Sequence, residues 1–491
     1  MIKSTVKFLI KDSLVYGIGN AVSRFVQIIT LLIIGPNVTK IEFNSWNNIS
    51  ISGSILAALI IFGMDSAVIR YYYDDTSEMH KKKVFTNGLL IQFFLAMIVL
   101  SVLLVGLPAP MLGSGNNAPD HATYIAFLCW VPANVFTLFF QNWFKWTFQK
   151  YKFISISFGV ALINLLLLIY FLQTRQLHIR TIVYSMAISQ AIVFVTACIM
   201  CAKYFYFHVD KVLIRKLLWY GAPMMLIMLF GTLRNSLDRI FLNKYLTPDS
   251  YALYNMAQKI GMLITLFIAA FDIAFGPMVF SMWDQKGAKG VIAKFQSYYL
   301  LCMLSCGLVI SASGKLLVVL FGGRNYEGAE KMIPILTLAN IIYGLYSFAS
   351  IGISYSKKSY LSLVALAISV TLIFSLNILL VKYFFQYAVA VALIAGNLLL
   401  VILGYYFSKK YYKIPFQFAA NFWFILLVAC IIVLLPHLEF VSNIYLDAAL
   451  KIAGGMLVIF VLSRFIFYKG ELRFLKTFLE RKFTDKKLAD I

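Results

Sequence analysis

Residues 81–107 read KKKVFTNGLLIQFFLAMIVLSVLLVGL, and this stretch decides the class of fold. Three lysines are followed by residues 84–107, which carry no charged side chain. A helix needs about 20 consecutive apolar residues to cross the hydrocarbon core of a membrane. The stretch therefore predicts a transmembrane helix, and the lysines before it predict that this end faces the cytoplasm.

The whole chain has the composition of a membrane protein. Of its 491 residues, 61% are hydrophobic and 13% are charged, whereas soluble domains carry about 25% charged residues. The apolar runs predict an all-α polytopic membrane protein with about fourteen transmembrane helices, and they exclude a soluble or a disordered chain. The predicted helices cover residues 12–35, 45–69, 84–107, 122–146, 154–172, 181–202, 217–242, 250–281, 295–321, 331–355, 360–381, 385–407, 417–436 and 444–467.

The excess of basic residues fits this topology. The chain has 43 Lys and Arg against 20 Asp and Glu, a formal net charge of +23. In a soluble protein this excess could indicate nucleic-acid binding, but in a membrane protein it marks the cytoplasmic loops. Thirty of the 43 fall on the N-terminal segment, every second loop and the C-terminal tail. We therefore expect both termini in the cytoplasm and no nucleic-acid partner.

The sequence offers no signature of an enzyme. The six cysteines lie mainly in apolar runs, which favours small buried side chains over redox or metal chemistry. Phosphate-binding Walker loops and zinc-type histidine clusters are missing, and the loops are too short for a catalytic domain. We predict no enzyme activity, no cofactor and no metal site, so transport would use an ion gradient, the membrane potential or the substrate gradient.

A faint internal repeat predicts two lobes. Tyr16-Gly17 at the start of the first helix is echoed by Tyr220-Gly221 in the seventh, and Asp65 in the second by Asp272 in the eighth. Repeated halves are common in transporters. The expected domains are two six-helix lobes in a pseudo-two-fold relation (1–208 and 209–408), two added helices (409–468) and a basic amphipathic tail (469–491). The tail would lie on the inner membrane surface or be a solvated end.

Polar side chains at membrane depth are the candidate substrate-binding residues. An ionisable group there costs at least a few kcal/mol and normally faces a wet cavity or a protein partner. Such residues recur at helical spacing on the first, fourth, seventh and eighth helices, and their deep charges are mostly cationic. Arginine and lysine suit phosphate oxygens, so we predict a cationic cavity for a phosphate-bearing substrate. The predicted substrate-binding residues are Asn20, Arg24, Gln27, Arg234, Asn255, Gln258 and Lys259.

Five further charged residues have two possible interpretations. Asp65 can be neutralised by Arg70 near the inner interface, and Asp238 can pair with Arg234 one helical turn away or belong with Arg239. These pairs would lock helices together. Alternatively, Asp238 and Asp272 can titrate as a proton or sodium relay.

Several stretches resemble the polysaccharide transport family of flippases, the Wzx-type O-antigen and capsule flippases of the multidrug/oligosaccharidyl-lipid/polysaccharide superfamily. The resemblance rests on LLWYGAP at 217–223, DRIFL at 238–242 and YALYNMAQKIG at 251–261. Further matches are FGMDSAVIRY at 62–71, KDSLVYG at 11–17 and FGP at 275–277. These motifs are spread over most of the chain but do not distinguish one substrate from another.

The resemblance implies a cargo and a mechanism. The cargo would be an O-antigen, capsule or exopolysaccharide repeat unit on a polyprenyl diphosphate, moved from the inner to the outer leaflet of a bacterial inner membrane by alternating access. Arg24, Arg234 and Lys259 would meet the diphosphate or acidic sugars. Expected partners are this lipid-linked oligosaccharide, membrane lipids, and a polysaccharide polymerase with its chain-length machinery. The alternatives are a flippase for peptidoglycan or teichoic precursors and a multidrug exporter of the same superfamily.

Overall fold

The protein is described by a computed structural model covering residues 24–75, 77–105, 120–283, 287–356, 358–415 and 418–466. Every regular element in these ranges is a helix, as predicted. Asn20, the motif at 11–17 and the tail at 469–491 lie outside the described residues.

The membrane-spanning helices match the predicted number. Eleven helices in the described ranges are long and apolar enough to cross a membrane, and shorter apolar helices cover Arg24–Asn37 and Trp423–His437. One span, α17 (Tyr360–Lys409), has 50 residues and a non-helical backbone at Phe385 (φ 48°, ψ −126°). At 1.5 Å per residue it is about 75 Å long, enough for two crossings of a core about 30 Å thick. Each of the fourteen predicted helices therefore has a counterpart.

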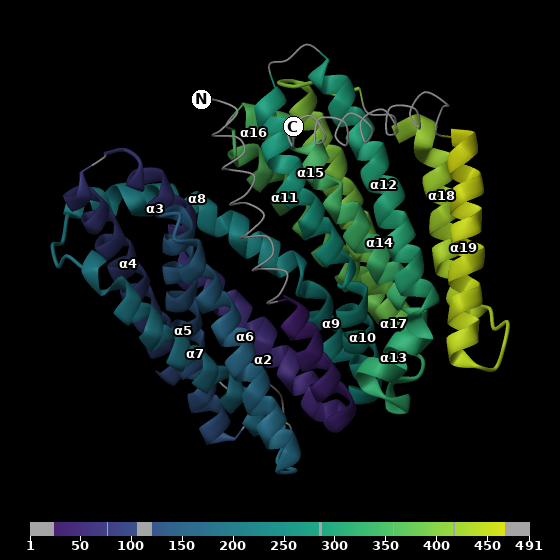
Figure 1. Ribbon diagram of the computed structural model, residues 1–491, viewed down its shortest axis with the longest axis horizontal. Coiled ribbons are helices and arrows are strands. Elements are labelled where there is room, and N and C mark those ends of the chain that lie inside the picture. The colour runs from purple at the N-terminus through teal and green to yellow at the C-terminus, as the bar shows by residue number, and fades with distance from the viewer. Residues whose placement is uncertain are drawn as a thin grey trace, which may run out of the picture. The chain divides into compact units, whose positions relative to one another are not determined.

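The chain divides into two compact units, each described here by itself (Figure 1). The first unit holds the described residues from 24 to 256, from 320 to 326 and from 358 to 404. Within it, α5 packs against α6 and α7, while α8 packs against α2, α3 and α4. Its helices are the segment Arg24–Asn37, α2 (Lys40–Ile61), α3 (Met64–Tyr72), α4 (Glu78–Val105), α5 (His121–Trp146), α6 (Lys150–Gln173), α7 (Ile179–Cys201), α8 (Lys211–Arg234), α9 (Leu237–Tyr245), most of α10 (Pro248–Gly261) and most of α17.

The second unit holds the described residues from 257 to 319, from 327 to 356 and from 405 to 466. Here α12 (Ala288–Ala312) packs against four other helices, α11, α14, α18 and α19. These neighbours are α11 (Ile264–Met282), α14 (Ile333–Gly344), α18 (Phe418–Leu434) and α19 (Ile444–Ile466); the unit also holds most of α13 (Gly314–Gly322), α15 (Tyr346–Ala349) and α16 (Ile351–Tyr355). The division into lobes at residues 208 and 408 stays a prediction.

Five predicted helices are interrupted in the described residues, those at 45–69, 217–242, 250–281, 295–321 and 331–355. The predicted helix 217–242 ends at Arg234 in α8, and the chain continues in α9 after Asn235 and Ser236. The predicted helix 250–281 is interrupted between Gly261 and Ile264. Hydropathy does not predict such breaks, because it reports how apolar a segment is and not where the backbone hydrogen bonds of its helix end.

The exposed face of α4 is largely apolar. Seven exposed side chains on this helix are large hydrophobics: Met79, Phe93, Phe94, Met97, Ile98, Val102 and Leu104. Such a face is expected to lie against lipid tails. The opposite side of α4 carries the fully buried Phe85, whose ring lies 4.6 Å from Trp143 and 5.3 Å from Phe205. Aromatic packing therefore fixes α4 against α5 and the connector before α8.

Asn87 on α4 holds that connector in place. This fully buried side chain donates from Nδ2 to the carbonyl oxygen of His208 (3.0 Å) and accepts at Oδ1 from the backbone N–H of Asp210 (3.1 Å). Asp210 caps α8, because its carboxylate accepts from the N–H groups of Val212 and Leu213. The hydrogen bond from Leu213 is the main cause that lowers the pKa of the Asp210 carboxyl. The cap's contribution to stability is thus present at neutral pH and lost as the pH falls through this lowered pKa.

A close backbone approach sets the position of α3 against α8. The turn between α2 and α3 places Gly63 at φ +67°, a left-handed conformation that glycine adopts without strain. A Cβ on Gly63 would lie 2.4 Å from the carbonyl oxygen of Gly221, and a Cβ on Gly221 would lie 2.6 Å from that of Phe62. The FGMD and WYGAP motifs therefore meet at two glycines, and their contact fixes Asp65, Arg70 and Tyr220 relative to one another.

We expect Asn87→Ala to lower the free energy of unfolding by about 1–3 kcal/mol, because it leaves a backbone carbonyl and an N–H of the connector unpaired. Thermal unfolding of the purified protein in detergent measures this loss. Ser54→Ala, on the exposed face of α2, is the control and should leave the midpoint nearly unchanged. Equal midpoints for the two variants would contradict this role of Asn87.

Gly221→Ala and Gly231→Ala form a matched pair on α8. A methyl group at 221 would overlap the backbone of the α2–α3 turn, so this variant should lose about 1–3 kcal/mol of stability. No atom lies within 4 Å of a Cβ at 231, so that variant should be neutral or gain up to about 1 kcal/mol from helix propensity. Thermal unfolding of both proteins checks the contrast, and a tolerated Gly221→Ala would be evidence against the close contact.

Candidate functional site

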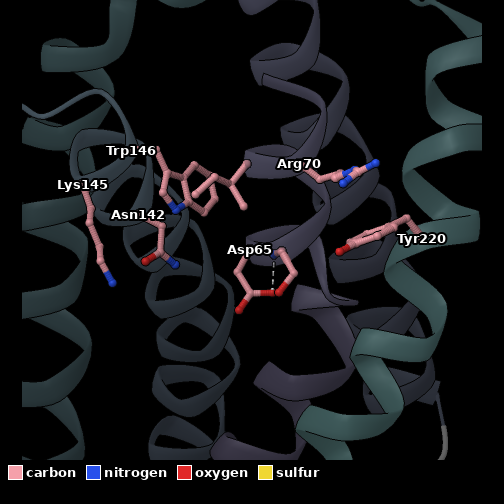
Figure 2. Close-up of a pocket in the computed structure, with 8 residues that line it drawn as sticks. Asp65, Arg70, Asn142, Lys145, Trp146 and Tyr220 are labelled. Carbon is pink, nitrogen blue, oxygen red and sulfur yellow. Dashed lines mark hydrogen bonds between the residues drawn. The ribbon is translucent and has the colours of Figure 1, made fainter. Parts of the chain in front are cut away.

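The first unit contains a polar pocket between α3, α5 and α8. Its volume is about 490 Å³, and Figure 2 shows its labelled side chains on either side of Asp65. Asn142 and Lys145 lie on one side, while Arg70 and Tyr220 lie on the other. The lining residues are Asp65, Ser66, Ile69, Arg70, Asn142, Lys145, Trp146 and Tyr220.

The pocket combines three kinds of side chain. Arg70 and Lys145 are exposed and supply positive charge, whereas Asp65 is half-buried and accepts a hydrogen bond from the N–H of Ser66 (2.8 Å). Asn142 adds an amide, and Tyr220 and Trp146 add aromatic surface. Cations with donors and aromatic rings suit a ligand that carries both phosphate and hydroxyl groups.

A second polar constellation joins α2 to α10, and we call it the α2–α10 ladder. Lys40 lies 3.1 Å from the carboxylate of Asp249. Asn44 donates to the carbonyl oxygen of Pro248 (2.7 Å) and accepts from the Nδ2 of Asn255 (2.9 Å). The last rung is the hydroxyl of Tyr251, which donates to the Oδ1 of Asn48 (2.7 Å).

The ladder follows from helix periodicity. Lys40, Asn44 and Asn48 are four residues apart, as are Tyr251 and Asn255, so each set lies along one face of its helix. Asn44, Tyr251 and Asn255 are buried, whereas the Asp249 side chain at one end is 75% exposed. The ladder therefore runs from a solvent-facing ion pair to hydrogen bonds that are shielded from water.

The third constellation surrounds the break between α8 and α9. Arg234 is only 4% exposed, and its guanidinium donates to the side-chain oxygens of Asn397 on α17 (2.9 Å) and of Asn235. Asp238 is fully buried, accepts from the hydroxyl of Tyr254 (2.7 Å) and lies 3.6 Å from the Nε of Arg239. Arg234 ends α8 and Asp238 lies on α9, so the two residues are not one turn apart on a single helix, which was the basis of their predicted pairing.

The predicted site residues are distributed over several places. Arg234, Asp238 and Arg239 are brought together at the break, Asn255 belongs to the ladder, and Asp65 and Arg70 line the pocket. Arg24 and Gln27 are exposed on the helix Arg24–Asn37. The other three predicted residues lie in the second unit, where Gln258 is buried and Lys259 and Asp272 are half-buried.

Sequence reasoning did not identify some of the polar residues that the structure places at these sites. Asn44 and Asn48 were not predicted, although their spacing from Lys40 in an apolar segment is a usable signal. Asn142 is three residues before Lys145, so the two share a helix face. Asn397 gave no such signal, because its role depends on contact with a helix far away in the chain.

Comparisons with known proteins agree with this architecture. A family model described as "Polysaccharide biosynthesis protein" matches residues 9–283. No curated protein matches the sequence. Among solved structures, an inward-facing multidrug resistance MATE family transporter of the MOP superfamily is similar at a TM-score of 0.63 and 12% identity, covering 81% of this chain and 94% of that one.

Two further structures have a similar fold. An outward-facing MATE family transporter aligns at a TM-score of 0.59 and 14% identity, over 82% of this chain and 95% of that one. A MOP superfamily transporter from Pyrococcus furiosus aligns at 0.59 and 15% identity, with the same coverage of both chains. At these identities the likeness concerns the fold, while the family match extends over more than half of the sequence. The chain is thus a multi-pass membrane protein with a MATE-like fold, and it belongs to the polysaccharide biosynthesis protein family.

Proposed function

We propose that the protein is a flippase that moves a polyprenyl-diphosphate-linked oligosaccharide from the inner to the outer leaflet of a bacterial inner membrane. The observation that carries the proposal is the guanidinium of Arg234, buried to 4% exposure and oriented by the amide oxygens of Asn397 and Asn235. The two amide oxygens hold the guanidinium in a fixed orientation. A cation oriented in this way suits the oxygens of a diphosphate.

The chemistry of this cargo requires a polar path. A diphosphate cannot enter hydrocarbon without a large desolvation cost, whereas its lipid tail can stay in the bilayer. Membership of the polysaccharide biosynthesis family supports a glycan as the rest of the headgroup. In this proposal the anion is bound by Arg24, Arg234 and Lys259. Their polar neighbours are Asn20, Gln27, Asn255 and Gln258. A polysaccharide polymerase and its chain-length machinery use the exported unit.

The α2–α10 ladder is a candidate outer gate. If both termini are cytoplasmic, as the basic residues predict, α2 and α10 both begin at the outer side, and the ladder lies there. Each of its hydrogen bonds contributes about 0.5–1.5 kcal/mol, so the set stabilises a closed end by only a few kcal/mol. A difference of this size can be reversed by substrate that binds the open state more tightly.

The cationic mechanism is tested by Arg24→Ala and Arg234→Ala, with Arg215→Ala on the exposed face of α8 as the matched control. We expect each of the first two variants to lose at least 90% of transport while inserting normally, because each removes a cation from the path. The assay is leaflet-resolved detection of lipid-linked oligosaccharide, with surface glycan analysis, in a complemented deletion strain of the native host. Full activity of both variants would remove the cationic mechanism.

The gate is tested by cross-linking α2 to α10. In a background without the native cysteines, Asn44→Cys with Asn255→Cys and a short bifunctional thiol reagent should stop transport, and reductant should restore it. Asp120→Cys with Arg180→Cys is the control, since these residues join α5 to α7 by an ion pair (2.8 Å) at a contact we expect to stay closed. Undiminished transport by the cross-linked ladder would show that it does not open.

Multidrug export is the second candidate, because the similar solved structures are named as multidrug resistance MATE transporters. The Pyrococcus furiosus transporter is described as having a binding pocket of reverse polarity that suggests a different function, so one fold is associated with more than one cargo. Cationic drugs favour carboxylates over Arg24, Arg234 and Lys259. In the deletion strain, drug sensitivity with intact glycans would favour export, whereas loss of viability with blocked cell-wall synthesis would indicate a peptidoglycan or teichoic precursor.

A further inference from the structure

We propose that the pocket between α3, α5 and α8 is a loading site that binds the glycosyl-diphosphate end of the cargo before it reaches Arg234. The place of this site in transport rests on the proposed function, but its binding chemistry does not. The ligand class is a sugar joined to a diphosphate.

The pocket is separate from the Arg234 constellation. Both lie on α8, with Tyr220 fourteen residues before Arg234, which corresponds to about 20 Å along the helix axis. A diphosphate spans less than half of that distance, so the two places cannot hold the same group at once. A diphosphate that binds at both places during transport must therefore pass from one to the other.

The pocket places a carboxylate between two cations, with Lys145 on one side of Asp65 and Arg70 on the other (Figure 2). Arg70 and Lys145 are exposed, so their cationic ends are accessible to a ligand that still belongs to the membrane surface. The half-buried Asp65 carboxylate repels phosphate and accepts hydrogen bonds from hydroxyl groups. The arrangement thus favours phosphate at the exposed cations and a sugar beside Asp65, rather than an anion throughout.

The remaining side chains suit a sugar. Asn142 can both donate to and accept from ring hydroxyls, and Tyr220 offers a ring and a hydroxyl. Tyr220 is held by an edge-on contact with Tyr71, their ring centres 6.2 Å apart. The volume of about 490 Å³ lies within the range of small-ligand sites, about 300–1,000 Å³. One or two sugar units with a diphosphate fit this size.

Neighbouring aromatic residues place the pocket at headgroup depth. Trp219 is 85% exposed next to Tyr220, and Tyr151 is 77% exposed just after α5. Trp219 lies near the start of the apolar part of α8, which follows Lys216, and exposed Trp and Tyr gather where such an apolar stretch meets the headgroups. The diphosphate of a lipid-linked glycan lies at the same depth, whereas a soluble nucleotide sugar has no tail to hold it there.

The experiment is a binding titration of the purified full-length protein in detergent. The probes are farnesyl-diphosphoryl-N-acetylglucosamine, farnesyl diphosphate, UDP-N-acetylglucosamine and phosphatidylglycerol. We expect Arg70→Gln with Lys145→Gln to weaken binding of the glycosylated lipid at least tenfold. The charge-matched control is Arg215→Gln with Lys216→Gln. Both residues are exposed on α8, and this variant should change binding less than twofold.

Two further variants separate the parts of the site. Asp65→Asn should weaken binding of the glycosylated probe severalfold but leave binding of farnesyl diphosphate unchanged, since only the sugar contacts this carboxylate. In an Arg234→Ala background, which does not transport, Arg70→Gln with Lys145→Gln should still weaken binding of the glycosylated probe, because this loss arises at the pocket. UDP-N-acetylglucosamine binding as tightly as the lipid probe would instead assign the pocket to a free nucleotide sugar and overturn the loading role.

Photo-crosslinking to the wild-type protein protects the test against variants that misfold. A diazirine on the sugar of the farnesyl probe should label peptides containing 65–70, 142–146 or 220. Absence of label from these peptides, unchanged binding by the Arg70 and Lys145 variant, or equal competition by phosphatidylglycerol would overturn the site. If the pocket binds the probe but wild-type proteoliposomes do not transport it, the proposed function fails and the site stands.

Discussion

The close approach of Gly63 and Gly221 is the contact on which the arrangement of the first unit depends. Because neither residue has a side chain, the backbone turn between α2 and α3 packs directly against α8. That packing brings Asp65 and Arg70 to Tyr220 at one place on α8, and α8 then carries Arg234 at its end. One helix thus connects the two sites of the proposed pathway, and its position is set by backbone rather than by adaptable side chains.

The sequence predicted the architecture well because a membrane imposes a simple rule. Stretches such as 84–107 must be apolar over a fixed length, and basic loops report which side they face. The predicted helices at 360–381 and 385–407 correspond to the two arms of α17 around Phe385. The break after Arg234 was missed, because Asn235 and Ser236 are compatible with a helix and only tertiary contacts determine where α8 ends.

The site was predicted in part, for a related reason. Ionisable residues in apolar runs are easily noticed, so Arg234, Asp238 and Asp65 were singled out. Neutral amides carry no charge signal, and Asn44, Asn48 and Asn397 become polar partners only through contacts more than 150 residues away in the chain. The pocket at α3, α5 and α8 likewise depends on three separate segments, each of which reads as an ordinary helix end.

The buried polar contacts of the α2–α10 ladder differ in kind from the one within α19. In the second unit, Lys451 and Asp447 form a buried ion pair (2.6 Å) within α19, and breaking such a pair costs about 3–5 kcal/mol. The buried rungs of the ladder are instead hydrogen bonds between neutral groups, each weaker and replaceable by water. An interface that opens once in each transport cycle is better built from such rungs, because water entering the gap satisfies every group that separates.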